Sequence, residues 1–87
     1  MSTDKAWYVY LVKTQLNEFY TGVSTDVDNR IKVHNAGKGS KMLRGSRLPV
    51  KLLVKIGPFK KADAHRIEVR VKRLPKRRKY SAMRDLI

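Results

Sequence analysis

The sequence predicts an α+β fold in which a small three-stranded antiparallel sheet is flanked by helices, in the order β-β-α-β-α-α. Two short β-rich segments lie close together near the N-terminus, and a third apolar segment follows at 50–56. Apolar residues recur with helical spacing in the stretches between and after these segments. With 87 residues the chain is long enough for one small domain, residues 1–87, and its thin core leaves no room for a large enclosed cavity.

The first two strands are predicted to form a hairpin. Residues 6–13 (AWYVYLVK) and residues 18–23 (EFYTGV) are rich in aromatic and β-branched side chains. Residues 14–17 form a turn between them, and this short gap favours antiparallel pairing. Gly22 lies inside the second strand, where glycine usually marks a bulge or the close approach of a backbone or ligand. We therefore expect Gly22 to have a structural role.

The first helix is expected to begin after Ser24 or Thr25, either of which can cap it. It ends near residues 35–36, and Gly37 fits as its terminator. One face of this helix carries Val27, Ile31 and His34, with Arg30 at its edge.

A flexible basic loop is predicted at 37–49, with one helical turn near Met42. The strand at 50–56 should be broken by Gly57-Pro58. A second helix is predicted at 60–74, where Pro75 stops it, and a final short basic helix at 76–87. The apolar stripe of each helix is expected to face the core. In the helix at 60–74 it consists of Ala64, Ile67, Val71 and Leu74, and in the final helix of Tyr80, Met83 and Ile87.

The net charge of +14 is carried entirely by residues 37–87. Residues 1–36 hold four basic and four acidic side chains, whereas residues 60–79 hold ten Lys or Arg and only two acids. A basic field confined to one part of a small domain favours a polyanion through phosphate contacts and counterion release. We predict a nucleic-acid partner, DNA more than RNA, over the alternative of a solvated basic face.

The composition also limits location and cofactors. The chain has no cysteine, so it can form neither disulfides nor a thiolate metal site. No apolar run approaches the ~20 residues of a membrane span, and the N-terminus lacks a secretory signal pattern. We expect an intracellular protein, cytoplasmic or nuclear, with no membrane partner. A domain this small has little room for a separate region that would direct it to a particular substrate. A protein partner or a dimer is therefore expected, and the oligomeric state stays open.

Five polar side chains could meet at one point of this fold: Tyr10, Tyr20, Arg30, His34 and Glu68. Phosphodiester hydrolysis needs a base near the attacking water, positive charge around the phosphorane and stabilisation of the departing oxygen. An arginine forks onto phosphate oxygens, and a histidine one helical turn later can reach the same phosphate. Glutamate is a hard oxygen ligand suited to Mg²⁺ or Mn²⁺.

Each of the five also has a structural alternative that the residues leave open. The two tyrosines could be ordinary strand-core residues, and the histidine could be a buried structural residue. Arg30 could pair with Asp26 four residues earlier. Glu68 could pair with Arg70 or Lys72 on a crowded basic helix.

The run Tyr8-Val9-Tyr10, then Tyr20-Thr21-Gly22, then Arg30, His34 and Glu68, resembles the GIY-YIG endonuclease superfamily, especially its small stand-alone single-domain members. The resemblance covers roughly residues 6–82. It implies the fold predicted above and cleavage of nucleic-acid phosphodiesters with one divalent ion, Mg²⁺ or Mn²⁺. It also implies the site: Tyr10, Tyr20, Arg30, His34 and Glu68 as catalytic residues, with Glu68 as the metal ligand.

Three positions depart from the family's pattern. Tyr8 replaces the glycine of the first motif, and Thr21 replaces the isoleucine of the second. Val23 stands where some branches carry a lysine, so another group must lower a tyrosine pKa here, or the activity is weak. We assign the base to the pair Tyr10 and Tyr20, leaning to Tyr20.

Basic residues of the loop and the second helix are expected to grip the nucleic-acid backbone: Lys38, Lys41, Arg44, Arg47, Arg66 and Lys72. No arrangement of side chains suggests reading of base edges, so sequence specificity should be low. The leading hypothesis is a metal-dependent DNA endonuclease, of use in DNA repair or recombination. The alternatives are a non-catalytic basic nucleic-acid-binding module of the same fold and a small basic ribonucleoprotein component. Glu68 favours the enzyme, because a pure binder gains nothing from an acid facing phosphate.

Overall fold

The computed structural model describes residues 5–86, which form a three-stranded antiparallel sheet with helices on both faces. The strand order is β2-β1-β3, so β1 is central and β2 and β3 are edges. The predicted α+β class and element order are therefore confirmed. The elements in chain order are β1 (Trp7–Lys13), β2 (Phe19–Ser24), α1 (Val27–Asn35), a 3₁₀ turn η1 (Gly45–Arg47), β3 (Lys51–Phe59), α2 (Lys61–Arg73) and α3 (Lys76–Arg84).

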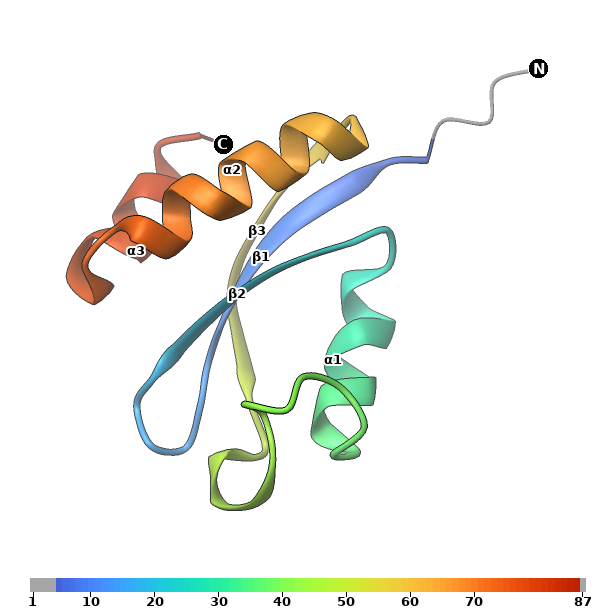
Figure 1. The fold of residues 1–87 in the computed structure, drawn as a ribbon, viewed down its shortest axis with the longest axis vertical. Coiled ribbons are helices and arrows are strands. Elements are labelled where there is room, and N and C mark those ends of the chain that lie inside the picture. The colour runs from blue at the N-terminus through green and yellow to red at the C-terminus, as the bar shows by residue number, and fades with distance from the viewer. Residues whose placement is uncertain (1–4, 87) are drawn as a thin grey trace.

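The two faces of the sheet carry separate apolar clusters, because alternate residues of a strand point to opposite sides. Val9 and Leu11 of β1 pack with Ala64 and Val71 of α2 and with Met83 of α3. The other face is covered by α1 and the loop after it, as Figure 1 shows. The residues on that face are Tyr10, Val12, Val27, Leu43 and Val50. Tyr10 is thus placed on the α1 side of the sheet.

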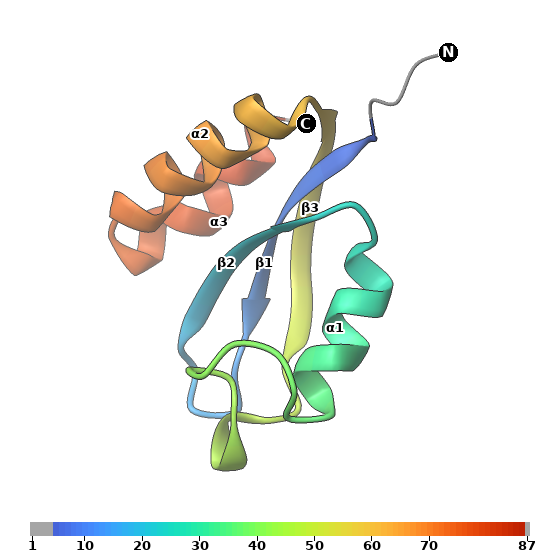
Figure 2. The ribbon, with the colours of Figure 1, turned by 45° about the vertical axis from the view of Figure 1, so that its right-hand side comes forward.

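The hairpin between β1 and β2 turns at residues 14–18, as predicted. The buried Thr14 hydroxyl accepts hydrogen bonds from the backbone amides of Leu16 (3.2 Å) and Glu18 (3.0 Å). The segment between α1 and β3 crosses this end of the sheet (Figure 2), where the amide of Gln15 donates to the carbonyl of Arg47 at 3.0 Å. The hairpin and the basic loop are therefore joined.

The predicted cap of the first helix is wrong. Asp26, and not Ser24 or Thr25, caps α1, since its carboxylate accepts from the amide of Asn29 at 3.1 Å. A turn does form near Met42, where the amide of Leu43 donates to the carbonyl of Ser40 at 3.0 Å, and the 3₁₀ turn at Gly45–Arg47 follows it. The predicted terminator is confirmed, because Gly37 follows α1 with a φ of +76°.

The third strand is longer than predicted, since β3 runs through Gly57-Pro58 to Phe59. The register shifts here, with Trp7 opposite Phe59 and Val9 opposite Ile56. An irregularity on an edge strand accommodates a proline without loss of a ladder hydrogen bond.

The last helix is also less buried than predicted. Met83 is fully buried, but Tyr80 is 38% exposed. Ile87 lies outside the described residues. Within 5–86, no helix has the length and apolar character needed to cross a membrane.

Candidate active site

A hydrogen bond between Tyr10 and His34 lies at the centre of the predicted site. Tyr10 comes from the middle strand and His34 from α1, and the phenol oxygen lies 2.8 Å from His34 Nε2. Both side chains are almost fully buried, at 1% and 0% exposure. The face of α1 that packs on the sheet therefore contributes a polar side chain, His34, as well as apolar contacts.

Tyr20 completes a cluster of three rings. Its centroid lies 5.5 Å from that of His34, in an edge-on arrangement, and 6.5 Å from that of Tyr10. In the register Tyr20 is opposite Val12 and Tyr10 is opposite Gly22, so the two tyrosines are diagonal neighbours. Tyr20 is half-buried, so this member of the cluster reaches the surface.

Two glycines make this packing possible. A Cβ on Gly22 would overlap the Tyr10 hydroxyl and ring, and a Cβ on Gly39 would overlap Nδ1 of His34. The predicted structural role of Gly22 is thus a close approach to Tyr10. Gly39 was missed, because a glycine in a Gly-rich basic loop carries no sequence signal that separates a contact from a turn.

Burial changes the acid–base properties of the Tyr10–His34 pair. Desolvation, with a smaller contribution from Tyr20, raises the pKa of Tyr10 to about 12, and the Arg30 guanidinium opposes this. Burial, followed by the positive charge of Arg30, lowers the pKa of His34. His34 Nδ1 is buried with no hydrogen-bond partner among the described residues. Burial therefore favours the neutral form of both groups.

Arg30 and Glu68 carry opposite charges that both act on Tyr10. Arg30 is half-buried at the edge of α1, and within residues 5–86 no ion pair with Asp26 forms. Glu68 comes from α2, and its negative charge makes a small contribution to the raised pKa of Tyr10. Tyr10, Tyr20 and His34 are therefore in contact, and the charges of Arg30 and Glu68 act on Tyr10.

Glu68 also makes ion pairs on its own helix. Its side chain is 16% exposed, and its carboxylate lies 3.6 Å from the Lys72 ammonium and 3.8 Å from Nδ1 of His65. The structural alternative for Glu68 is thus realised in the absence of substrate. Lys72 is the partner, whereas pairing with Arg70 is not found among the described residues.

The side chains around Glu68 limit the kind of divalent ion that the site could hold. The described part of the chain has no group of three or more His, Cys, Asp or Glu side chains that could hold a metal. Mg²⁺ takes only one or two carboxylates and keeps several waters, with substrate phosphate completing its shell. One partly buried glutamate fits that pattern, and it does not fit an ion that requires a full protein cage.

The predicted nucleic-acid contacts differ in their surroundings. Arg47 is held by Glu18, with Nε 2.6 Å from the carboxylate, and Arg66 pairs with the exposed Asp63 at 3.3 Å. Lys72 belongs to the Glu68 pair. The remaining three, Lys38, Lys41 and Arg44, are exposed on the loop after α1.

Comparison with known proteins places this chain among small proteins of similar length. A UPF0213 protein of Citrobacter koseri is 46% identical over 74 residues, which are 84% of this chain and 72% of that protein. A UPF0213 protein of Cupriavidus necator is 42% identical over 85% of this chain and 79% of its own length.

A solved structure agrees with the fold. The solution structure of a UPF0213 protein of Bacillus halodurans superimposes with a TM-score of 0.53 at 43% identity, over 87% of this chain and 80% of that chain. The profile of the GIY-YIG catalytic domain matches residues 6–81, the stretch that contains all five clustered side chains. The chain belongs to the GIY-YIG catalytic-domain family, a family of nucleases.

Proposed function

We propose that this protein is a metal-dependent endonuclease that hydrolyses phosphodiester bonds in DNA with low sequence specificity, in DNA repair or recombination. The observation that carries the proposal is the Tyr10–His34–Tyr20 cluster, on which the Arg30 charge acts. A neutral hydrogen-bonded core under the influence of a cation suits a reaction that moves a proton next to a phosphate.

Tyr20 is the proposed general base. The pKa of Tyr10 is raised to about 12, so this phenol keeps its proton at neutral pH. Tyr20 is half-buried and its ring lies against both other members of the cluster, so it is the tyrosine that a water at the surface can reach. Tyr10 and His34 then hold Tyr20 in position through ring contacts, and Arg30 forks onto the phosphate oxygens.

Glu68 is the proposed ligand for Mg²⁺ or Mn²⁺, because it is the carboxylate whose charge acts on the cluster. When bound, such an ion supplies Lewis-acid stabilisation to the phosphate and the departing 3′ oxygen. Lys72, at 3.6 Å, keeps Glu68 charge-balanced without the ion. The pair would have to open for the ion to bind.

The test is nicking of supercoiled plasmid by pure protein with Mg²⁺ or Mn²⁺. Glu68→Gln and Arg30→Ala should each reduce the rate by roughly 100-fold or more, the range for removal of one preorganised charge. Asp63→Asn is the matched control for Glu68→Gln, since it removes an exposed carboxylate from the same helix. Equal nicking by wild type and Glu68→Gln would reject Glu68 as the metal ligand.

A non-catalytic nucleic-acid-binding module is the second candidate function. The observation in its favour is that Glu68 already pairs with Lys72 and His65, as an ordinary helix-surface acid would. This candidate predicts salt-sensitive binding that Glu68→Gln leaves unchanged, with no turnover of duplex, single-stranded, flap, branched or RNA substrates.

A further inference from the structure

An open groove of about 1000 Å³ lies between the hairpin end of the sheet and α3. Its floor includes Phe19 and Leu53, which pack against the apolar cluster of the α2 and α3 face. Tyr10 and its neighbours lie on the opposite face of the sheet. The groove is therefore separate from the candidate active site.

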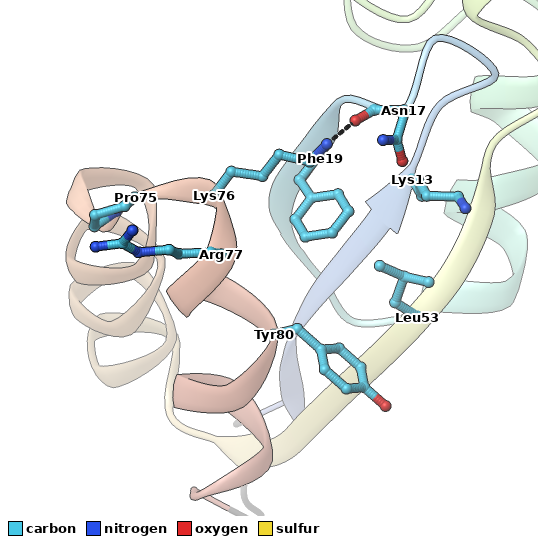
Figure 3. Close-up of a pocket in the computed structure, with 8 residues that line it drawn as sticks. All are labelled: Lys13, Asn17, Phe19, Leu53, Pro75, Lys76, Arg77 and Tyr80. Atoms are coloured by element: carbon cyan, nitrogen blue, oxygen red, sulfur yellow. Dashed lines mark hydrogen bonds between the residues drawn. The ribbon is translucent and has the colours of Figure 1, made fainter.

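The groove has an aromatic and apolar lining. Figure 3 shows Phe19, Leu53 and Tyr80 gathered between α3 and the sheet. Tyr80 is 38% exposed, although Met83 on the same helix is fully buried. The Tyr80 hydroxyl accepts a hydrogen bond from Arg84 at 3.1 Å. Arg84 comes one helical turn later, so it fixes the tilt of an exposed ring without burying it.

The rim of the groove is cationic. Lys13, Lys76 and Arg77 line it, and no acidic side chain of residues 5–86 does. Lys51 stands directly opposite Lys13 in the sheet, a like-charge arrangement that costs stability unless an anion lies nearby. Within residues 5–86, none of these four enters an ion pair.

Lys76 connects the cationic rim to the aromatic floor. Its ammonium donates to the backbone carbonyl of Asn17 and lies 4.9 Å from the centroid of the Phe19 ring. An ammonium carries three donors, so two remain for a phosphate.

We propose that this groove binds unpaired nucleotides of a single-stranded nucleic-acid segment. Bases stack on Tyr80 and against Phe19, while Lys13 and Lys76 contact the phosphates. Exposed aromatic rings next to a basic rim are the combination that single strands require, because every base has a flat face to stack. A duplex keeps its bases inside, and an acidic peptide has charge without the flat rings that Tyr80 would match.

The proposal rests on the proposed function, because it supplies a holding site for the strand that is cut. Phe19 and Tyr20 are successive residues of β2, so they face opposite sides of the sheet. Phe19 belongs to the groove and Tyr20 to the catalytic cluster, and β2 is an edge strand. A single strand passing around this edge would contact both sites.

The experiment measures binding of a fluorescein-labelled decathymidylate by anisotropy in EDTA, where cleavage cannot occur. Tyr80→Ala should weaken binding roughly tenfold, as loss of one stacking ring does, and Tyr80→Phe should restore most of it. Val69→Ala is the matched control, since Val69 is an exposed apolar residue (45%) on α2 outside the groove. Blunt duplex binding should be the same for wild type and Tyr80→Ala.

The rim is tested in the same assay. Lys76→Ala should weaken binding and reduce the salt dependence of log Kobs by about 0.7, the value for one single-strand phosphate. Lys60→Ala removes the same charge from an exposed position outside the groove and should leave that slope unchanged.

Three results would overturn the proposal: decathymidylate binding by Tyr80→Ala equal to wild type, equal affinity for an abasic oligonucleotide, or equal affinity for polyglutamate. The last would assign the groove to an acidic protein instead. Because the assay excludes cleavage, its outcome is independent of the nicking test on Glu68→Gln. A protein that binds through Tyr80 but never cleaves would keep the groove and lose the proposed endonuclease.

Discussion

The hydrogen bond between Tyr10 and His34 is the central contact of the candidate site at the scale of single residues. A phenol and an imidazole, each with almost no exposure, are joined by one hydrogen bond and shifted toward their neutral forms. The sequence predicted both residues but not their bond, because the bond depends on how α1 docks onto the sheet. The residues next to Tyr10 and His34 in the sequence carry no information about how the helix docks.

Tyr10→Phe removes the hydroxyl and keeps the ring. We expect the free energy of unfolding to fall by about 1–3 kcal/mol, because His34 Nε2 loses its buried partner. Nicking should fall by roughly 10²-fold if the hydroxyl helps to position the proton acceptor. Tyr8→Phe, two residues earlier on the same face of β1, is the control. A Tyr10→Phe protein with wild-type activity would remove Tyr10 from the mechanism.

The lowered pKa of His34 predicts a pH dependence of stability. The unfolded chain takes up the imidazole proton near pH 6.5, whereas the folded protein resists it. The free energy of unfolding should therefore fall as the pH drops below 6.5. His34→Gln cannot take up this proton, so the stability difference between wild type and variant should shrink from pH 7.5 to pH 5.

Urea denaturation at the two pH values measures this effect. The exposed His65→Gln is the control for the loss of any histidine. A gap between wild type and His34→Gln that stays constant with pH would mean that His34 is protonated in the folded protein as readily as in the unfolded chain.

At the scale of elements, the site depends on the close packing of α1 and the loop after it against the β1–β2 hairpin. Gly22 on β2 admits the Tyr10 ring, and Gly39 admits the imidazole of His34. A core packed to this density has no room for an extra methyl group.

Gly22→Ala should therefore displace the Tyr10 ring. We expect a loss of about 1–3 kcal/mol in stability from overpacking and a loss of nicking at least as large as that of Tyr10→Phe. Gly37→Asn is the control, because that site has open space and asparagine tolerates its positive φ. Thermal unfolding and the plasmid assay measure both effects. Unchanged activity in Gly22→Ala would show that the ring position does not matter.

Features that depend on a single segment of the chain could be predicted from the sequence, whereas features that depend on contacts between segments could not. Period-2 and period-3.6 patterns predicted every strand and α-helix, because burial of one face is a property of the segment itself. The N-cap was assigned to Ser24 or Thr25 instead of Asp26, since several capping residues stand together and only the backbone decides among them. The end of β3 was missed because an edge strand tolerates Gly57-Pro58 where a central strand would not.

Tyr80 shows the same limit for the site. Its spacing with Met83 indicated burial, but Tyr80 lines the open groove beside α3 and stays 38% exposed. The five catalytic candidates were identified because motif order is visible in sequence. The groove was not, because it joins the β1–β2 hairpin to β3 and α3, which are distant from it in the chain.

At the scale of the whole molecule, charge and chemistry are divided between two parts of the chain. The electrically neutral first 36 residues supply four of the five clustered side chains, and the basic remainder supplies Glu68 and the surface for a polyanion. This division means that binding and cleavage can be changed separately. Substitutions of the exposed lysines and arginines of the basic loop should alter affinity without touching the ring cluster.

Duplex binding should accordingly depend steeply on salt, with each phosphate contact adding about 0.9 to the slope of log Kobs against log salt. Lys41→Ala combined with Arg44→Ala should lower that slope by up to about 1.8, because both side chains are exposed on the loop after α1. Lys5→Ala combined with Lys32→Ala removes the same charge from exposed positions of the neutral part and should leave the slope near wild type. Anisotropy in EDTA across a KCl series measures both. Equal slopes for the two double variants would mean that net charge, and not the placement of the basic loop, attracts the DNA.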